Sequence, residues 1–583
     1  MLCNLPFRIA LISALVLDLA AGPTMLQGQE TATDFPSITI RANTRLVVVD
    51  VVVTDKSGQP VHGLKSEDFT LEENGKKQKI SIFVPPGIAN RTAATPAAPG
   101  ILSNRPENVV AGGVPMVLLL DAANSSFSNQ SYARSQMLKY VVEHAQGPPI
   151  AVLTLTDRLR VLQQFTSDPQ VLLAAIKNFR PQEPILQPGA APSPYLSSGG
   201  LGGSSGQSSV SNLAGAIQDF ANIQIGYNLE RRTLITLDAM RTLTWMLGGL
   251  PGRKNVVWLT ASLPFDLVPE DRNVTDAELL ADLPAQGKQR MVGVNSAGSV
   301  AAEQRELHNG EIREAEAQLA SAGVAIYPVD LRGLVSGMEN SAAHGGGVYS
   351  DPTRLSNRAT AQADSLISSH GTMEEVAAQT GGKAYFNENE IREGVALAAA
   401  DERASYSLGY YPENKKWDGK LRNIKVKLDH GDTEIRYRKG YFAIEPGLIK
   451  DHNYEQDVVA ALAVDAPATQ VSFKAQAKAT DPGKVRVVFL VDAHTLTAED
   501  SGGSKKMNVS LYATVWGSGD KSLAAQSIKV DKAFDAATYQ QILDKGMMVP
   551  IDLTIPAGGT ELRLAVLDNK TGFIGTVSEP LGQ

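Results

Sequence analysis

Four short apolar runs, each ending in a polar residue, constrain the fold of this chain more than any other feature. They are MVLLLD (116–121), IAVLTLTD (150–157), NVVWLT (255–260) and GVAIYPVD (323–330). Runs of this length without polar alternation are typical of strands buried on both faces of a parallel sheet. Helical spacing appears between them, for example over 131–145. We therefore expect repeated β–α units that form a doubly wound, mostly parallel sheet with helices on both faces.

This α/β module is expected to span residues 114–404. The run LRVLQQFT (159–166) follows the second strand too closely for a crossover helix, so we expect it to pair antiparallel with that strand. Residues 184–218 contain no Lys, Arg, Asp or Glu and are rich in Gly, Ser and Pro, which predicts a flexible insertion. Residues 336–369 have a similar but less extreme composition.

The segments on either side of the module read as β-structure. In the N-terminal β segment, 38–86, a β-branched run is followed by two strands around Asn74-Gly75, a strong hairpin signal. The segment 405–445 also contains strands. Each is too small to bury a core alone. We expect the two segments to pair into one sandwich, with the module inserted between them.

Two further regions complete the expected organisation. Residues 87–113 have the Pro, Ala, Asn and Gly composition of a linker and little periodicity. Residues 455–583 alternate apolar and polar positions over several runs, which predicts a C-terminal β-sandwich. The expected fold class is therefore α/β plus all-β, a doubly wound sheet flanked by β-sandwich domains.

The first 28 residues have the layout of a secretory signal peptide. Arg8 precedes an apolar stretch from Ile9 to Ala21, and small residues follow. The stretch is shorter than the roughly 20 residues that a membrane span needs. We expect an exported protein, periplasmic or secreted, with an uncleaved N-terminal anchor as the alternative. The single cysteine, Cys3, lies in this segment, so a disulfide framework and a Cys-ligated zinc site are excluded.

Charge and hydropathy limit the partners of the chain. With 54 Lys and Arg against 62 Asp and Glu, the 583 residues carry a formal net charge of −8. This balance argues against a nucleic-acid partner, which usually requires a basic surface. No later segment has 18 consecutive apolar residues, so we expect no integral membrane span after signal cleavage.

Several segments taken together identify a family resemblance. The chain resembles the VWFA-related Acidobacterial domain family, exported proteins built around a von Willebrand factor A-like module. The resemblance implies that fold and an export route, and it implies no ligand. The matching segments are LVVVDVVVTDKSGQPVHGLKSEDFTLEENGKKQKI (46–80), MVLLLDAANSSFSNQSYARSQMLKYV (116–141), PGRKNVVWLTASLP (251–264), QTGGKAYFNEN (379–389), YSLGYYP (406–412) and RYRKGYFA (436–443).

The resemblance also implies a place for a metal ion. Modules of this type usually bind a divalent cation at the carboxyl ends of the central strands, through an Asp-x-Ser-x-Ser loop, a Thr and a further Asp. In this sequence Asp121 and Ser125 match the first loop, and Asn124 could supply an amide carbonyl. Thr233 is the nearest candidate for the Thr. These four residues are the candidate metal ligands.

Two expected ligands are missing from that pattern. Ala123 stands in place of the middle Ser, and Ala261 in place of the second Asp. One carboxylate with scattered hydroxyls should hold Mg²⁺ weakly. We therefore expect no resident cofactor, and Asp121 to cap a turn at the strand end, with Mg²⁺ or another divalent cation at this degenerate site as the alternative.

Aromatic residues are concentrated between 406 and 442. This cluster is either a carbohydrate- or peptide-binding platform or the core of a β-structure. Because alternate members fall on opposite faces of their strands, the core is the favoured interpretation. The aromatic residues are Tyr406, Tyr410, Tyr411, Trp417, Tyr437, Tyr441 and Phe442.

Catalytic motifs give no support for an enzyme. The sequence has no HExxH, P-loop or dinucleotide fingerprint, and none of its eight histidines pairs with another at metal-ligand spacing. We expect an exported, non-enzymatic binding or adhesion protein that engages a protein partner through loops 121–129, 184–218 and 261–270. The alternative is an exported hydrolase or accessory factor. A pocket at the strand ends that joins Asp121 to a buried carboxylate or histidine would favour the alternative.

Overall fold

The computed structural model has a mixed α/β fold with several β-sheets. The predicted signal peptide lies outside the described residues, as do parts of three expected loops. Within the described residues, no helix is both long and apolar enough to span a membrane. The structure describes residues 46–87, 100–110, 115–144, 147–182, 207–265, 296–332, 352–386, 391–429, 431, 433–443, 453–519 and 521–581.

A five-stranded sheet forms the centre of the molecule, in the order β10-β9-β6-β7-β8. The four apolar runs form its parallel strands, and nearly every position in them is buried. The short connection after β7 leaves β8 antiparallel to it, as predicted. A single parallel bridge from Val329 to Tyr385 continues the sheet beyond β10. The strands are β6 (Met116–Asp121), β7 (Ile150–Leu155), β8 (Leu159–Thr166), β9 (Lys254–Thr260) and β10 (Val324–Asp330).

Helices pack on both faces of this sheet because both faces of each strand are apolar. Val117, Leu119, Val256 and Trp258 face one core, which three long helices cover. These helices are α4 (Gln207–Leu247), α7 (Ser296–Ser321) and α8 (Pro352–Thr380).

The alternate residues of the strands, including Leu118, Leu120 and Val257, face a second core on the opposite side. The helices covering it are α2 (Phe127–Glu143), α3 (Pro169–Asn178) and α9 (Ile391–Arg403).

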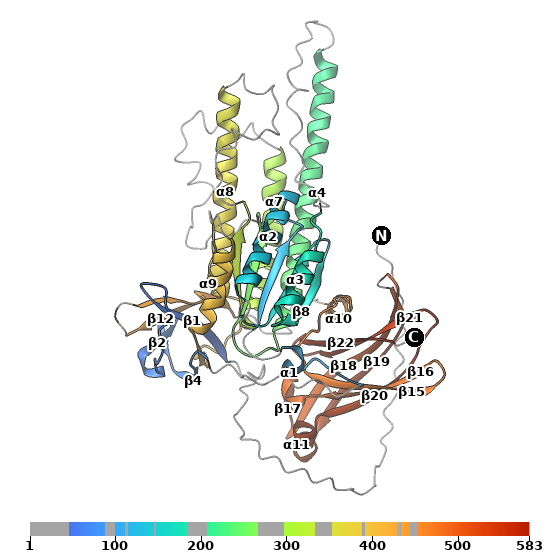
Figure 1. The fold of residues 1–583 in the computed structure, drawn as a ribbon. Helices are drawn as coiled ribbons and strands as arrows, with labels where there is room; N and C mark the ends of the chain where they lie inside the picture. Colours follow the sequence, from blue (N-terminus) through green and yellow to red (C-terminus); the bar gives the residue numbers. More distant parts are fainter. Residues whose placement is uncertain are drawn as a thin grey trace.

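The long helices extend well past the sheet, at the carboxyl ends of its strands (Figure 1). At 1.5 Å per residue the 41 residues of α4 cover about 60 Å, whereas the seven residues of β9 cover about 23 Å. Both α4 and α7 end just before the strand that follows them, so their N-terminal parts form the projection. This corrects two sequence predictions, because residues 207–218 and 352–369 are helical rather than loop.

Strands from 47–84 and from 405–442 share two four-stranded sheets around a common core. In one sheet β1 pairs antiparallel with both β11 and β13, and in the other β2 pairs with β12. The run after Asn74-Gly75 divides into β3 and β4, which belong to different sheets. The strands are β1 (Val47–Asp55), β2 (Phe69–Glu73), β3 (Lys76–Gln78), β4 (Ile80–Val84), β11 (Ser405–Tyr410), β12 (Leu421–Leu428), β13 (Thr433–Arg436) and β14 (Gly440–Phe442).

Most of the aromatic cluster lies in this sandwich, as the core interpretation predicts. Tyr406 and Tyr410 are fully buried, and Tyr437 and Tyr441 are nearly so. The Tyr410 and Tyr441 hydroxyls donate to the buried carboxylate of Glu73, at 2.7 and 2.8 Å. These tyrosines are therefore unavailable as a binding platform.

A second sandwich lies toward the C-terminus, with two sheets on one core. Its strand β18 is buried on both faces. Two helices break the expected all-β pattern of 455–583, namely α10 (Tyr454–Leu462) and α11 (Ala536–Lys545). The strands from this region are β15 (Phe473–Asp481), β16 (Lys484–Val491), β17 (Ala498–Ser501), β18 (Ser504–Gly517), β19 (Lys521–Phe534), β20 (Met547–Thr554), β21 (Gly559–Asp568) and β22 (Ile574–Pro580).

The segment predicted as a linker, 87–113, also contributes to this C-terminal sandwich. Its strand β5 (Ile101–Ser103) pairs antiparallel with Lys474–Gln476 of β15. The buried Asn104 then donates to the carbonyls of Ala468 and Val471 at 2.7 and 2.8 Å. A short helix, α1 (Pro106–Val109), follows. The linker prediction is therefore wrong for residues 101–109.

Candidate functional site

The candidate metal site is centred on Asp121, the last residue of β6 at the carboxyl end of the sheet. Its side chain is fully buried. The backbone N–H of Asn124 donates to Oδ1 of Asp121 at 2.9 Å, which closes a turn directly after the strand. The side-chain amide of Asn124 also donates to the carboxylate, with Nδ2 lying 3.1 Å from Oδ1 and 2.9 Å from Oδ2. Asp121 therefore caps the turn that ends its own strand.

The neighbouring strand β9 supplies two more partners. The indole Nε1–H of Trp258 donates to Oδ2 of Asp121 at 3.0 Å. The Thr260 hydroxyl lies 3.0 Å from the same oxygen and 2.8 Å from the carbonyl of Ser262. Trp258 and Thr260 are two residues apart, so period-two alternation places both on the face toward which Asp121 points.

A positive charge reaches the site from α4. Nε of Arg232 donates to Oδ1 of Asn124 at 2.8 Å, and the Asn124 amide also donates to Oγ1 of Thr236 at 3.2 Å. Burial lowers the pKa of the Arg232 guanidinium, and the charge of Asp121 opposes that shift. Burial likewise raises the pKa of Asp121, against the bonds that it accepts from Asn124, Trp258 and Thr260.

The other two predicted ligands, Ser125 and Thr233, form their hydrogen bonds with backbone groups rather than with Asp121. Oγ of Ser125 accepts from the backbone N–H of Ala261 at 3.1 Å, which joins the loops after β6 and β9. Thr233 lies within α4, and its hydroxyl is 2.9 Å from the carbonyl of Pro264 and 3.0 Å from that of Leu229. The hydroxyl that contacts Asn124 belongs to Thr236, three residues after the predicted Thr233.

Sequence reasoning missed Arg232, Thr236 and Trp258. The signal for the first two was available, because Arg232 and Thr236 are four residues apart and share a helix face with the buried Met240. A basic residue on the apolar face of a helix needs a buried partner, and Asp121 was the acidic residue already assigned to the sheet edge.

These residues do not fit a divalent cation. A metal ligand must present lone pairs, whereas the groups directed at Asp121 are N–H and O–H donors. Ala123 and Ala261 have no side-chain oxygen, and Arg232 brings a positive charge next to the place that a cation would take. Elsewhere in the described residues no group of three or more His, Cys, Asp or Glu side chains could hold a metal.

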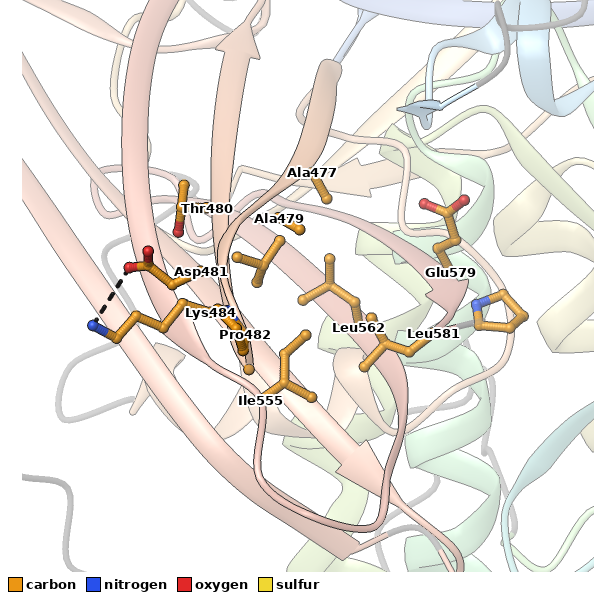
Figure 2. A pocket seen from close by; sticks show the side chains of 13 residues that line it. Ala477, Ala479, Thr480, Asp481, Pro482, Lys484, Ile555, Leu562, Glu579 and Leu581 are labelled. Atoms are coloured by element: carbon orange, nitrogen blue, oxygen red, sulfur yellow. Dashed lines mark ion pairs between the residues drawn. The ribbon is translucent and has the colours of Figure 1, made fainter. Parts of the chain in front are cut away.

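One cavity lies far along the chain from Asp121, in the C-terminal sandwich. It has a volume of about 590 Å³ and opens where β15 and β22 end (Figure 2). Apolar side chains such as Ile555, Leu562 and Leu581 form much of its wall. Its rim carries an exposed ion pair between Asp481 and Lys484, 3.7 Å apart. It therefore does not join Asp121 to a second titratable group.

Comparison with known proteins gives only distant similarities. No protein-family model and no curated protein matches the chain. An aerotolerance-related membrane protein from Bacteroides fragilis is similar over 50% of this chain and 100% of its own length, at 13% identity with a TM-score of 0.22. The conserved hypothetical protein BatB from Bacteroides thetaiotaomicron is similar over 50% and 98%, at 12% identity with a TM-score of 0.23.

A third similar structure is described as a von Willebrand factor type A protein from Catenulispora acidiphila. The similarity covers 94% of this chain and 74% of that one, at 8% identity with a TM-score of 0.18. TM-scores this low establish no shared overall fold.

Proposed function

We propose that the chain is an exported binding or adhesion protein whose von Willebrand factor A-like module engages a protein partner without a metal ion. The proposal rests on the hydrogen bonds that the Asp121 carboxylate accepts from the side chains of Asn124, Trp258 and Thr260. The carboxylate that would hold a cation is occupied by the protein's own donors. The positive charge that would come from a cation comes from Arg232.

The architecture supports a doubly wound, von Willebrand factor A-like arrangement. The first strand, β6, is central, one edge strand is antiparallel, and helices cover both faces. In open α/β sheets of this kind, ligands bind outside the carboxyl ends of the strands, where the strand order reverses. That point lies between β6 and β9, at Asp121 and Thr260, and the long helices project at the same end (Figure 1).

A direct test of the metal-independent part is calorimetric titration of Mg²⁺, Mn²⁺ and Ca²⁺ into the mature chain and an Asp121→Ala variant. We expect the same negligible heats for both proteins. Saturable heat in the natural chain that disappears in Asp121→Ala would refute this part of the proposal.

The location of partner binding is tested by blocking one face at a time. A chain lacking Cys3 has no other cysteine, so a single introduced cysteine can be labelled with a bulky polyethylene glycol maleimide. Tyr227 on α4 is 53% exposed, and Ile528 on β19 is 37% exposed. We expect labelled Tyr227→Cys to lose the partners that the unlabelled chain captures from envelope proteins. Labelled Ile528→Cys, the matched control, should retain them in the presence of EDTA. The reverse pattern would move the binding surface to the C-terminal sandwich.

A further inference from the structure

A second buried carboxylate, Asp330, ends the strand next to β9. It is the last residue of β10 and pairs in register with Thr260. Its side chain is 1% exposed, yet two partly exposed side chains, Arg332 and His370, meet on it, each 22% exposed. These three residues are not among the candidate metal ligands, but they lie at the same end of the sheet as Asp121.

The Asp330 carboxylate is saturated by its neighbours. Oδ1 accepts the backbone N–H and Nε–H of Arg332, each at 2.9 Å. Oδ2 lies 2.9 Å from Nη2 of Arg332 and 2.8 Å from Nε2 of His370. A carboxylate with this many donors is an anchor for the two cationic side chains rather than a ligand for a cation.

The donors of Arg332 are only partly used by this arrangement. Nε bonds to Asp330, and Nη2 bonds to Asp330 and, at 3.1 Å, to Oγ of Ser369. These bonds account for three of the five N–H groups of a guanidinium. In the part of the chain that the structure describes, the hydrogen bonds of the Arg332 side chain leave the two N–H groups of Nη1 unused.

His370 is held in one orientation. Its ring stacks on Phe386 with centroids 4.1 Å apart, and Nε2 faces Asp330 at 2.8 Å. Because Asp330 is an acceptor, Nε2 carries the proton of this bond, which leaves Nδ1 as the second polar atom of the ring. Asp330 bonds to His370, Arg332 shares the same carboxylate oxygen, and the exposed Glu374 lies one turn along α8.

We propose that Arg332 and His370, fixed side by side by Asp330, form a docking site for a carboxylate side chain of a protein partner. An incoming carboxylate accepts from Nη1–H of Arg332 and, when the ring carries a proton on both nitrogens, from Nδ1–H of His370. Asp330 neutralises one positive charge, so recognition depends on directed N–H groups more than on net charge. This inference rests on the proposed function and names the partner chemistry at that end of the sheet.

The test uses hexaglutamate as the probe and hexaglutamine as its uncharged counterpart, with the complete mature chain. We expect calorimetry to detect hexaglutamate but not hexaglutamine. Arg332→Gln and His370→Gln should each weaken binding about tenfold or more, because each removes a charged hydrogen bond. Arg332→Lys, which keeps an ion pair with Asp330, replaces Arg332→Gln if that variant fails to fold.

Arg160→Gln is the matched control. Arg160 also pairs with an Asp, with Nη2 3.0 Å from Oδ1 of Asp157, at the carboxyl end of β7, but no histidine shares that carboxylate. We expect this variant to bind hexaglutamate within twofold of the natural chain. Equal weakening in all three variants, or unchanged binding in Arg332→Gln and His370→Gln, would overturn the docking site.

A spectroscopic measurement separates docking from general electrostatic attraction. In ¹⁵N-histidine spectra, the Nδ1 signal of His370 is identified by its absence in His370→Gln. Hexaglutamate should change the chemical shift of this signal from that of an acceptor nitrogen to that of an N–H nitrogen. An unchanged signal would overturn the proposal. Because these experiments need no natural partner, their failure alongside successful blocking at Tyr227→Cys would refute the carboxylate chemistry while leaving the proposed binding function in place.

Discussion

Replacing Asp121 by Ala distinguishes an internal hydrogen-bond network from a metal site by the sign of its effect on stability. In the structure the carboxylate receives the Trp258 indole N–H at 3.0 Å and the Asn124 amide at 2.9 Å. It also lies close enough to the buried Arg232 to oppose the lowering of its pKa. Removing the carboxylate leaves these donors unpaired and the guanidinium without its nearby negative charge.

We expect Asp121→Ala to lower the free energy of unfolding by about 3 to 5 kcal/mol, the usual cost of leaving a buried charge without its partner. Urea denaturation followed by tryptophan fluorescence measures this value, since Trp258 lies in the network. Asp157→Ala is the control. Asp157 pairs with Arg160 at the surface, each side chain being 44% exposed, and its loss should cost less than about 1 kcal/mol.

The opposite result would refute the reasoning. A carboxylate kept for a metal ion is unpaired in the metal-free protein, so its removal would leave stability unchanged or increase it. If Asp121→Ala is as stable as the natural chain in EDTA, the network is not what holds the end of β6.

Three further changes test other parts of the structure. Burial lowers the pKa of Lys254 to about 8, so the folded protein loses this proton at lower pH than the unfolded chain. Relative to Lys254→Met, the natural chain should therefore gain about 3 kcal/mol of stability between pH 7 and 11, measured by urea denaturation at each pH. In Gly249→Ala the new Cβ would lie 1.8 Å from the carbonyl oxygen of Thr469. This should cost about 3 kcal/mol and separate the calorimetric transition of the C-terminal sandwich from that of the α/β module. Trp258→Phe keeps the apolar ring but loses the bond to Asp121, and should lower the urea-derived free energy of unfolding by about 2 kcal/mol.

Local patterns predicted the elements of this fold where the sequence alone determines the backbone. The run 116–121 had no polar alternation and forms β6, buried at every position. Asn74-Gly75 predicted a tight hairpin, and both residues have the positive φ angles that such a turn requires, 48° and 78°. In each case residues close in sequence carry the whole signal.

Prediction failed where an element depends on a distant partner. Ile101–Ser103 has too few residues to show alternation, and its strand exists because Lys474–Gln476 offers an open edge. The Gly- and Ser-rich start of α4 looked like loop, yet it continues a helix whose C-terminal half packs on the sheet. The low helix propensity of Gly and Ser is a weak effect, and it did not outweigh the continuation of a helix that is already packed.

The residues around Asp121 were predicted only in part. Asp121 and Asn124 were proposed as metal ligands from the resemblance to a von Willebrand factor A-like loop, and the structure joins them by hydrogen bonds in one turn. The absent oxygens at Ala123 and Ala261 indicated that a cation would be held weakly. The loop pattern could not predict that Arg232 supplies the positive charge at this site, because Arg232 lies on a helix 108 residues after Asn124.

Strand β5, in the segment predicted as a linker, has a consequence for folding during synthesis. Asn104 bonds to the backbone of Phe473, 369 residues later, and Leu64 bonds to Tyr406, 342 residues later. At ordinary synthesis rates of about 5 to 20 residues per second, the first partner waits roughly 20 to 70 s for the second. Both β domains therefore begin before the α/β module and can close only after it. During that interval the first strands of both domains have unpaired backbone groups, so they are open edges at which two unfinished chains could pair with each other.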